Sequence, residues 1–389
     1  MIYNLSKFHS KYDIIYHAYG GGLMFKFKIG PLLLFVFSSF ILGLGVKYKK
    51  ATGLIYTNII NKFIREKLSL LFGKVDIPVG DILTIIFILL MIYFLINFIR
   101  RLFSPTKWLI YIYRVFWGGV NIFCLGFFIF VLFYGLNYHT QPLANSLLDK
   151  YNAKYSTNIE VHVGTNKQLE VLKYLEGKAI DTRNLIKHDQ NSSLSNINDL
   201  SLQAEEGFRI VSDAFPSLAG KYSRAKLSVK SPVFDILGLE GRYYILTNEV
   251  SISKDLPDIY KPFLVSKYLA YQRGIAREDE AMFFAYLAGI NNTNPSVKYS
   301  AYISILSMMT QSMMLDNKVE YNYFVSNMDK DIRSDMNLIS KFRSKNSPGK
   351  KITDKVKYNF KRLNGDVRFD SLEREISILM ASYYSLFTY

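Results

Sequence analysis

The sequence predicts a mainly α-helical membrane protein, in which three N-terminal transmembrane helices precede an α+β domain outside the membrane. Two observations carry this prediction. Three long stretches without a charged residue lie within the first 138 residues, and the rest of the chain has the composition of a globular domain with one β-rich segment. Half of the 389 residues are hydrophobic, and the length accommodates both a membrane anchor and a domain with a full core.

Each uncharged stretch is long enough to cross a bilayer. A spanning helix needs about 17–25 apolar residues, and a buried core helix rarely stays apolar on every face for that length. We expect an N-terminal segment (residues 1–28) and a transmembrane region (29–138) with spans at about 29–46, 82–99 and 115–138. Asp81 stands where it can cap the N-terminus of the second span.

Basic residues in the connections predict the orientation. The connection between the second and third spans carries four basic residues and no acidic one, and the segment before the first span is also basic. Because such loops stay in the cytoplasm, we expect a multi-pass protein of the cell (inner or plasma) membrane with an extracytoplasmic C-terminal domain. The basic loop between the first two spans argues for the opposite orientation, but the second connection is more compact and purely basic.

A basic amphipathic helix is expected within that first loop, over about residues 55–73. Apolar residues recur there at helical spacing with basic residues between them: Ile59, Ile60, Phe63, Ile64 and Leu68, with Lys62, Arg65 and Lys67. Such a helix can lie on anionic lipid headgroups. Packing against the C-terminal domain explains the pattern equally well.

Charge and cysteine content exclude several classes of protein. Residues 1–137 carry 15 basic and four acidic side chains, whereas the remainder carries 33 and 28. The excess positive charge therefore lies beside the membrane, which indicates a lipid bilayer as partner and no nucleic acid. The single cysteine, Cys124, excludes a disulfide scaffold and a cysteine-based metal site.

The remaining residues, 139–389, are expected to form one domain. The segment Arg242–Ser253 is rich in β-branched and aromatic residues and predicts a strand. Polar loops are expected over 188–198 and 344–351. Helices are expected over 145–155, 165–185, 200–215, 259–273, 278–289, 300–315, 321–344 and 371–388.

The segment Pro262–Ala288 predicts two helices joined by a tight turn at Gly274. Lys267 and Tyr271 are four residues apart and share a helix face, and three acidic residues open the second helix. This layout is that of a zincin, in which a helix bearing a His-Glu-x-x-His sequence faces a second helix that supplies a carboxylate.

The chain resembles an uncharacterised bacterial membrane family, domain-of-unknown-function family 3810, over close to its full length. The most specific match is QRGIAREDEA (Gln272–Ala281). Similar segments are FYGLNYHTQPL (133–143), GLEGRYYILTNEVSISKDLPDIYKPF (238–263), KYSAYISIL (298–306) and NGDVRFDSLEREISILMASYY (364–384). The resemblance implies three spans followed by a zincin-like, more closely gluzincin-like, domain whose metal-binding helix typically reads HELAHQRG.

This chain departs from the family pattern at the metal site. Lys267 stands where the first histidine is expected, Tyr268 where the catalytic glutamate is expected, and Tyr271 where the second histidine is expected. Glu278 and Glu280 match the region of the third ligand. Lysine is a cation and tyrosine is a rare zinc ligand, so the resemblance implies a degenerate His-Glu-x-x-His motif without catalytic residue, metal or cofactor.

Loss of the metal leaves carboxylates in need of a partner. Unpaired buried carboxylates are costly, so we expect Lys267 to pair with Glu278 or Glu280 and to hold the two helices together. The alternative is that Lys267 extends to solvent and pairs with nothing.

These expectations indicate a membrane-anchored pseudoenzyme, a pseudo-metallopeptidase that binds a peptide or protein at the cell envelope without cutting it. The strand over Arg242–Ser253 is the expected substrate side, where Tyr244, Thr247 and Glu249 stand near an added peptide strand. Two alternatives remain: an active hydrolase with a non-standard site, and a purely structural or assembly protein of the membrane.

Overall fold

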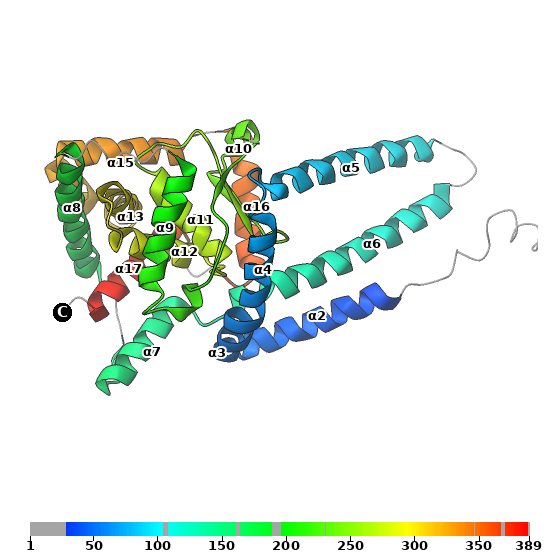
Figure 1. Cartoon of the computed structure of the whole chain (residues 1–389), viewed down its shortest axis with the longest axis horizontal. Helices are drawn as coiled ribbons and strands as arrows, with labels where there is room; N and C mark the ends of the chain where they lie inside the picture. The colour runs from blue at the N-terminus through cyan, green and yellow to red at the C-terminus, as the bar shows by residue number, and fades with distance from the viewer. Residues whose placement is uncertain are drawn as a thin grey trace, which may run out of the picture.

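Three apolar helices project from one end of a helical domain (Figure 1). The structure is a computed structural model, and it describes residues 29–103, 108–160, 164–188, 196–229, 231–345, 347–366 and 370–387. The three helices are long and apolar enough to cross a membrane: α2 (Ile29–Lys47), α5 (Val79–Leu102) and α6 (Trp108–Phe133). The predicted three-span membrane protein with a mainly helical domain is therefore confirmed.

The third span ends five residues before the uncharged stretch that predicted it. It ends at Phe133, and a 3₁₀ turn, η2 (Gly135–His139), follows. Gly135 to Tyr138 are buried. Their lack of charge therefore reflects burial at the junction between span and domain.

The loop between the first two spans is helical and lies across the direction of the spans (Figure 1). It contains α3 (Lys49–Ala51), the π-helix η1 (Thr52–Asn61) and α4 (Lys62–Phe72). Polar residues four positions apart are buried, namely Thr57, Asn61, Arg65 and Ser69, whereas Ile59, Phe63 and other apolar residues of the loop are exposed. Packing against the domain is confirmed, and the packed face is the polar one.

Most helices of the domain match the predicted segments. They are α7 (Leu143–Tyr155), α8 (Thr165–His188), α9 (Ile197–Val211), α11 (Lys261–Gln272), α12 (Glu278–Ile290), α13 (Pro295–Asp316) and α17 (Leu372–Phe387). The single helix expected over 321–344 is two, α14 (Lys318–Asn327) and α15 (Lys330–Arg343), because Asp329 caps a new helix through its side chain. A 3₁₀ turn, η3 (Pro216–Leu218), and two helices without a prediction complete the set: α10 (Ser231–Leu237) and α16 (Lys350–Leu363).

The expectation of one strand over Arg242–Ser253 is wrong, because this segment folds into a hairpin. Strand β2 (Gly241–Tyr244) pairs antiparallel with β3 (Glu249–Ile252), and β3 also pairs in parallel with β1 (Lys226–Leu227). The order is therefore β1-β3-β2, with β2 as an outer strand. The chain reverses at Asn248, which has a positive φ of 51° that asparagine tolerates better than most residues.

The core of the domain is built around α11, α12 and α13. Almost every residue of α12 and most residues of α13 are buried, and α12 packs against α9, α11, α13 and α17. A helix that is apolar on all faces belongs at the centre of a helical layer. This arrangement fixes the two helices that carry the predicted site.

Candidate functional site

The turn between α11 and α12 is as tight as predicted. Gly274 has a φ of +89°, which side chains other than glycine rarely adopt. A Cβ at this position would overlap the guanidinium of Arg65 on α4. The turn therefore needs glycine both for its backbone and for the close approach of the juxtamembrane helix.

Lys267 and Glu278 form an ion pair between the two helices, which confirms the predicted contact. The Lys267 Nζ lies 2.7 Å from Glu278 Oε1 and 3.6 Å from Glu240 Oε2. Lys267 is 2% exposed, and the side chain of Glu278 is 23% exposed. The alternative, a lysine that extends to solvent without a partner, is wrong.

The electrostatic balance keeps both groups of the pair charged. Burial opposes ionisation of each, but the carboxylates of Glu278 and Glu240 raise the pKa of Lys267 well above its usual value. The Lys267 ammonium, with help from Lys357 and Lys361, in turn holds the pKa of Glu278 well below its usual value. A charged, hydrogen-bonded pair of this kind is stronger than a neutral contact.

The two tyrosines of the predicted site lie beside this pair. The ring centre of Tyr268 is 5.5 Å from Lys267 Nζ, within the range of a cation–π contact, and 5.6 Å from the ring centre of Tyr271. Burial raises the pKa of both phenols above their usual value, and the negative charge of Glu278 adds to this effect. Both side chains are therefore neutral at physiological pH.

Glu280 lies on a different face and has a different role from Glu278. Its Oε1 accepts hydrogen bonds from the Leu143 backbone N–H at 2.8 Å and from Arg277 Nη1 at 3.1 Å. Arg277 also donates to the carbonyl oxygens of Tyr138 and Thr140. Of the two carboxylates predicted as partners of Lys267, only Glu278 binds it, whereas Glu280 holds the chain that leaves the third span.

A cavity of about 830 Å³ opens at the ion pair. Glu240, Lys267 and Glu278 contribute to its wall, and apolar residues of α13, including Met314 and Leu315, contribute another part. Lysines of α16 line it as well, namely Lys350, Lys357 and Lys361. Sequence reasoning missed Glu240 and this helix; the amphipathic pattern of residues 350–363 is the signal that would have identified the helix.

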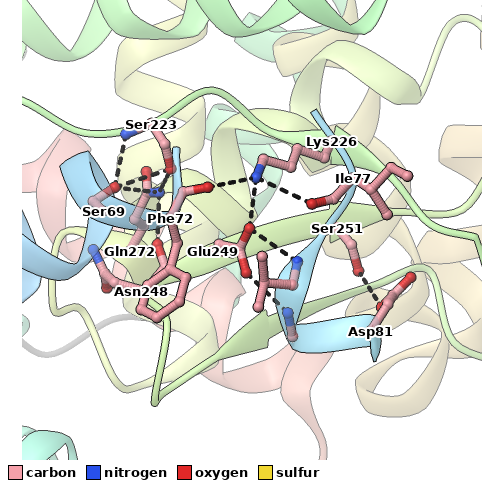
Figure 2. A network of polar contacts seen from close by, with 12 residues as sticks. Ser69, Phe72, Ile77, Asp81, Ser223, Lys226, Asn248, Glu249, Ser251 and Gln272 are labelled. Atoms are coloured by element: carbon pink, nitrogen blue, oxygen red, sulfur yellow. Dashed lines mark hydrogen bonds and ion pairs between the residues drawn. The ribbon is translucent and has the colours of Figure 1, made fainter. Parts of the chain in front are cut away.

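Two of the three residues expected on the substrate side, Glu249 and Tyr244, contact the first turn of the second span, and Figure 2 shows Glu249 there. Glu249 forms a buried ion pair with Lys226 at 2.5 Å and accepts hydrogen bonds from the first N–H groups of α5, at Val79 (3.1 Å) and Gly80 (2.9 Å). Tyr244 donates to Asp81, and Thr247 is buried in the turn between β2 and β3. The structure does not bring these three side chains to the wall of the cavity.

Asp81 binds the domain, and its predicted role as the cap of its own span is taken by Glu249. Asp81 accepts hydrogen bonds from Ser228 Oγ at 2.8 Å and from the Val229 N–H at 3.0 Å. A carboxylate at a helix N-terminus compensates the free N–H groups and the helix dipole. Here that carboxylate comes from β3, so the span and the sheet are joined directly.

A zinc ion does not fit the residues at the α11–α12 pair. The groups present are an ammonium, two neutral phenols and two carboxylates, Glu278 and Glu240, both of which lie within ion-pair distance of the ammonium. Zinc requires imidazole, thiolate or carboxylate ligands. Within the ranges that the structure describes, no three histidine, cysteine, aspartate or glutamate side chains gather to hold a metal ion. The arrangement therefore offers a cavity with a partly charged wall beside an apolar one.

A family model described as "Protein of unknown function (DUF3810)" matches residues 56–367. The match begins in η1 and includes the second and third spans, the sheet, the α11–α12 pair and α16. No curated protein and no solved structure matches the chain.

Proposed function

The chain belongs to the DUF3810 family, and we propose that its domain is a catalytically inactive relative of zincin metallopeptidases that binds a peptide or protein segment in the cavity beside Lys267. The observation that carries the proposal is the Lys267–Glu278 pair. The lysine ammonium lies against the carboxylate that matches a zincin's third ligand, at the wall of an open cavity. With an ammonium in place of a catalytic metal, we expect the site to bind a ligand without hydrolysing it.

The surroundings of the cavity support a peptide as ligand. Gly238, Leu239 and Glu240 line the cavity and lead directly into β2, an outer strand of the sheet. An extended peptide can add to such a strand through backbone hydrogen bonds, while pockets along it select side chains. The exposed apolar residues Met314 and Leu315 offer such a pocket on the opposite wall.

The proposal places the binding site at the cell envelope. The protein is a multi-pass component of the cell (inner or plasma) membrane, and the domain is extracytoplasmic. In Figure 1, α2, α5 and α6 project from the domain in the same direction, so their far ends lie together on the side opposite the domain. The segment before the first span and the connection between the second and third spans are therefore on the same side of the membrane. Both are strongly basic, which favours the cytoplasm for that side and the opposite side for the domain.

Peptide selection with the full-length protein in lipid nanodiscs tests the proposal. A displayed peptide library is enriched on the protein against empty discs, and affinities of the enriched synthetic peptides are measured by titration. Leu315→Trp fills the cavity and should weaken binding by about tenfold or more, or about 1.4 kcal/mol. Val319→Trp is the matched control, because Val319 lies on α14, is exposed and does not line the cavity. Equal affinity of the two variants, or no enrichment over empty discs, would refute the proposal.

A further inference from the structure

Helix α16 has two opposite faces with different surroundings. Lys350, Asp354, Lys357, Tyr358 and Lys361 line the cavity. Ile352, Val356, Phe360 and Leu363 follow one another at intervals of four, four and three residues, which places them together on the other side of the helix.

The apolar face of α16 is exposed. Ile352 is 69% exposed, Val356 is 61% exposed and Leu363 is 83% exposed. Large apolar side chains that gather on one exposed helix face mark a surface that contacts lipid or protein. The helix is nevertheless fixed to the domain, because Lys361 pairs with Glu375 on α17 at 2.8 Å.

The position of α16 indicates which of these surfaces it contacts. Figure 1 shows α16 at the end of the domain from which the spans project, lying across their direction. The ring of Phe360 packs at 5.7 Å from Phe130 in span α6 and at 5.6 Å from Tyr138 just after it. Because Phe360 shares the apolar face, that face adjoins the domain end of the third span.

The charge of α16 matches a membrane surface. Six basic residues and one acidic residue lie between Lys350 and Leu363. Lys351, Lys355 and Arg362 are exposed and stand beside the apolar face. Basic side chains next to an apolar face are characteristic of helices in the lipid–water interface, where each contributes about 1 kcal/mol near anionic headgroups.

We propose that α16 lies in the lipid–water interface, with Ile352, Val356 and Leu363 among the acyl chains and Lys351, Lys355 and Arg362 against the phosphates of anionic lipids. The exposed apolar residues of η1 and α4 lie at the same end of the domain and extend this surface. The cavity, lined by the opposite face of α16, then opens beside the membrane surface. The inference does not depend on what the cavity binds.

Tryptophan fluorescence in reconstituted vesicles tests the proposal with the full chain. The two native tryptophans, Trp108 and Trp117, are replaced by phenylalanine, and a single tryptophan is introduced as Ile352→Trp. Tyr358→Trp on the cavity face is the matched control. In vesicles of phosphatidylcholine and phosphatidylglycerol with brominated acyl chains, the tryptophan at position 352 should lose most of its emission relative to unbrominated vesicles. The tryptophan at position 358 should keep its emission.

The same assay tests the role of charge. Quenching at position 352 should be stronger with phosphatidylglycerol present than in phosphatidylcholine alone, and Lys351→Gln, Lys355→Gln and Arg362→Gln together should remove that difference. If thermal unfolding shows that Ile352→Trp does not fold, Val356→Trp is used for the same measurement. Emission at positions 352 and 356 that is unaffected by bromine would overturn the proposal. Quenching of equal strength with and without phosphatidylglycerol would overturn the assignment of Lys351, Lys355 and Arg362 to anionic lipid phosphates. Cross-linking between copies through Val356→Cys, without quenching, would assign the face to a second copy of the chain instead.

Discussion

At the residue scale, one ion pair, Lys267–Glu278, joins α11 and α12. The pKa of Glu278 is lowered, so the pair's contribution to stability is present above the usual pKa of a carboxyl group and is lost as the pH falls through the lowered value. The pKa of Lys267 is raised, so its contribution is present below the usual lysine pKa and is lost only as the pH rises through the raised value. Across physiological pH the two helices therefore remain bound through opposite charges.

Restoring metal ligands tests whether this scaffold is related to zincins. The triple variant Lys267→His, Tyr268→Glu and Tyr271→His should gain a stoichiometric zinc site with a dissociation constant of about 1 μM or tighter, about 8 kcal/mol. The physical reason is that two imidazoles would share a face of α11 opposite Glu278, which loses its lysine partner. Metal analysis after dialysis and zinc titration provide the measurement.

The control for this experiment is the triple variant with Glu278→Gln added, which should bind zinc more weakly because the third ligand is lost. Both variants must unfold at a similar temperature for the comparison to hold. If the triple variant binds no more zinc than the parent, α11 and α12 do not have zincin geometry.

At the scale of elements, the sequence predicted those with a strong pattern and missed those defined by contacts. The uncharged spans and the long helices α8, α12 and α13 could be predicted, because their hydrophobic pattern is sustained over many residues. Helix α16 was missed because its exposed apolar face interrupts a lysine-rich stretch that reads as polar. The hairpin was missed because the turn at Asn248 is stabilised from outside, by a hydrogen bond from its side chain to the carbonyl oxygen of Arg65.

The candidate site was also predictable only in part. The pairing of Lys267 followed from the two adjacent helices, since a buried lysine needs a carboxylate. The third member, Glu240, comes from the segment before β2, and no local pattern relates it to α11. The role of Glu249 at the root of the second span was equally hidden, because capping across separate elements depends on tertiary contacts.

The junction between β3 and span α5 should be essential for stability. Glu249→Gln removes the negative charge that compensates the Lys226 ammonium, whose other hydrogen bonds go to the carbonyl oxygens of Phe72 and Ile77 (Figure 2). Breaking a buried pair in this way costs about 3–5 kcal/mol. Denaturant unfolding of the detergent-solubilised full chain measures the loss.

Asp149→Asn is the control for this prediction. Asp149 pairs with Lys50 at 2.8 Å, but both side chains are largely exposed, so its removal should cost at most about 1 kcal/mol. Similar losses in the two variants would mean that the buried junction contributes no more than a surface pair.

At the scale of the whole molecule, domain and membrane region form a continuous unit. The polar face of α4 hydrogen-bonds to α11 through Ser69 and Gln272, and the first turn of α5 binds β3 (Figure 2). Arg277 holds the chain that leaves α6. Composition and charge predicted both parts of the molecule. They did not predict this junction, since its residues are spread over the chain and each looks like an ordinary polar residue in its own segment.

The orientation of this unit is tested by labelling single cysteines with a membrane-impermeant maleimide. In a Cys124→Ser background, Val319→Cys reports on the domain and Phe103→Cys on the far end of α5, and both native side chains are exposed. The basic connection after α5 should stay in the cytoplasm because moving positive charge across the membrane is unfavourable. Intact spheroplasts should therefore label Val319→Cys strongly, and Phe103→Cys only after permeabilisation. The reverse pattern would place the domain, its cavity and α16 on the cytoplasmic leaflet, where anionic lipid would still attract the helix but the partner would have to be a cytoplasmic one.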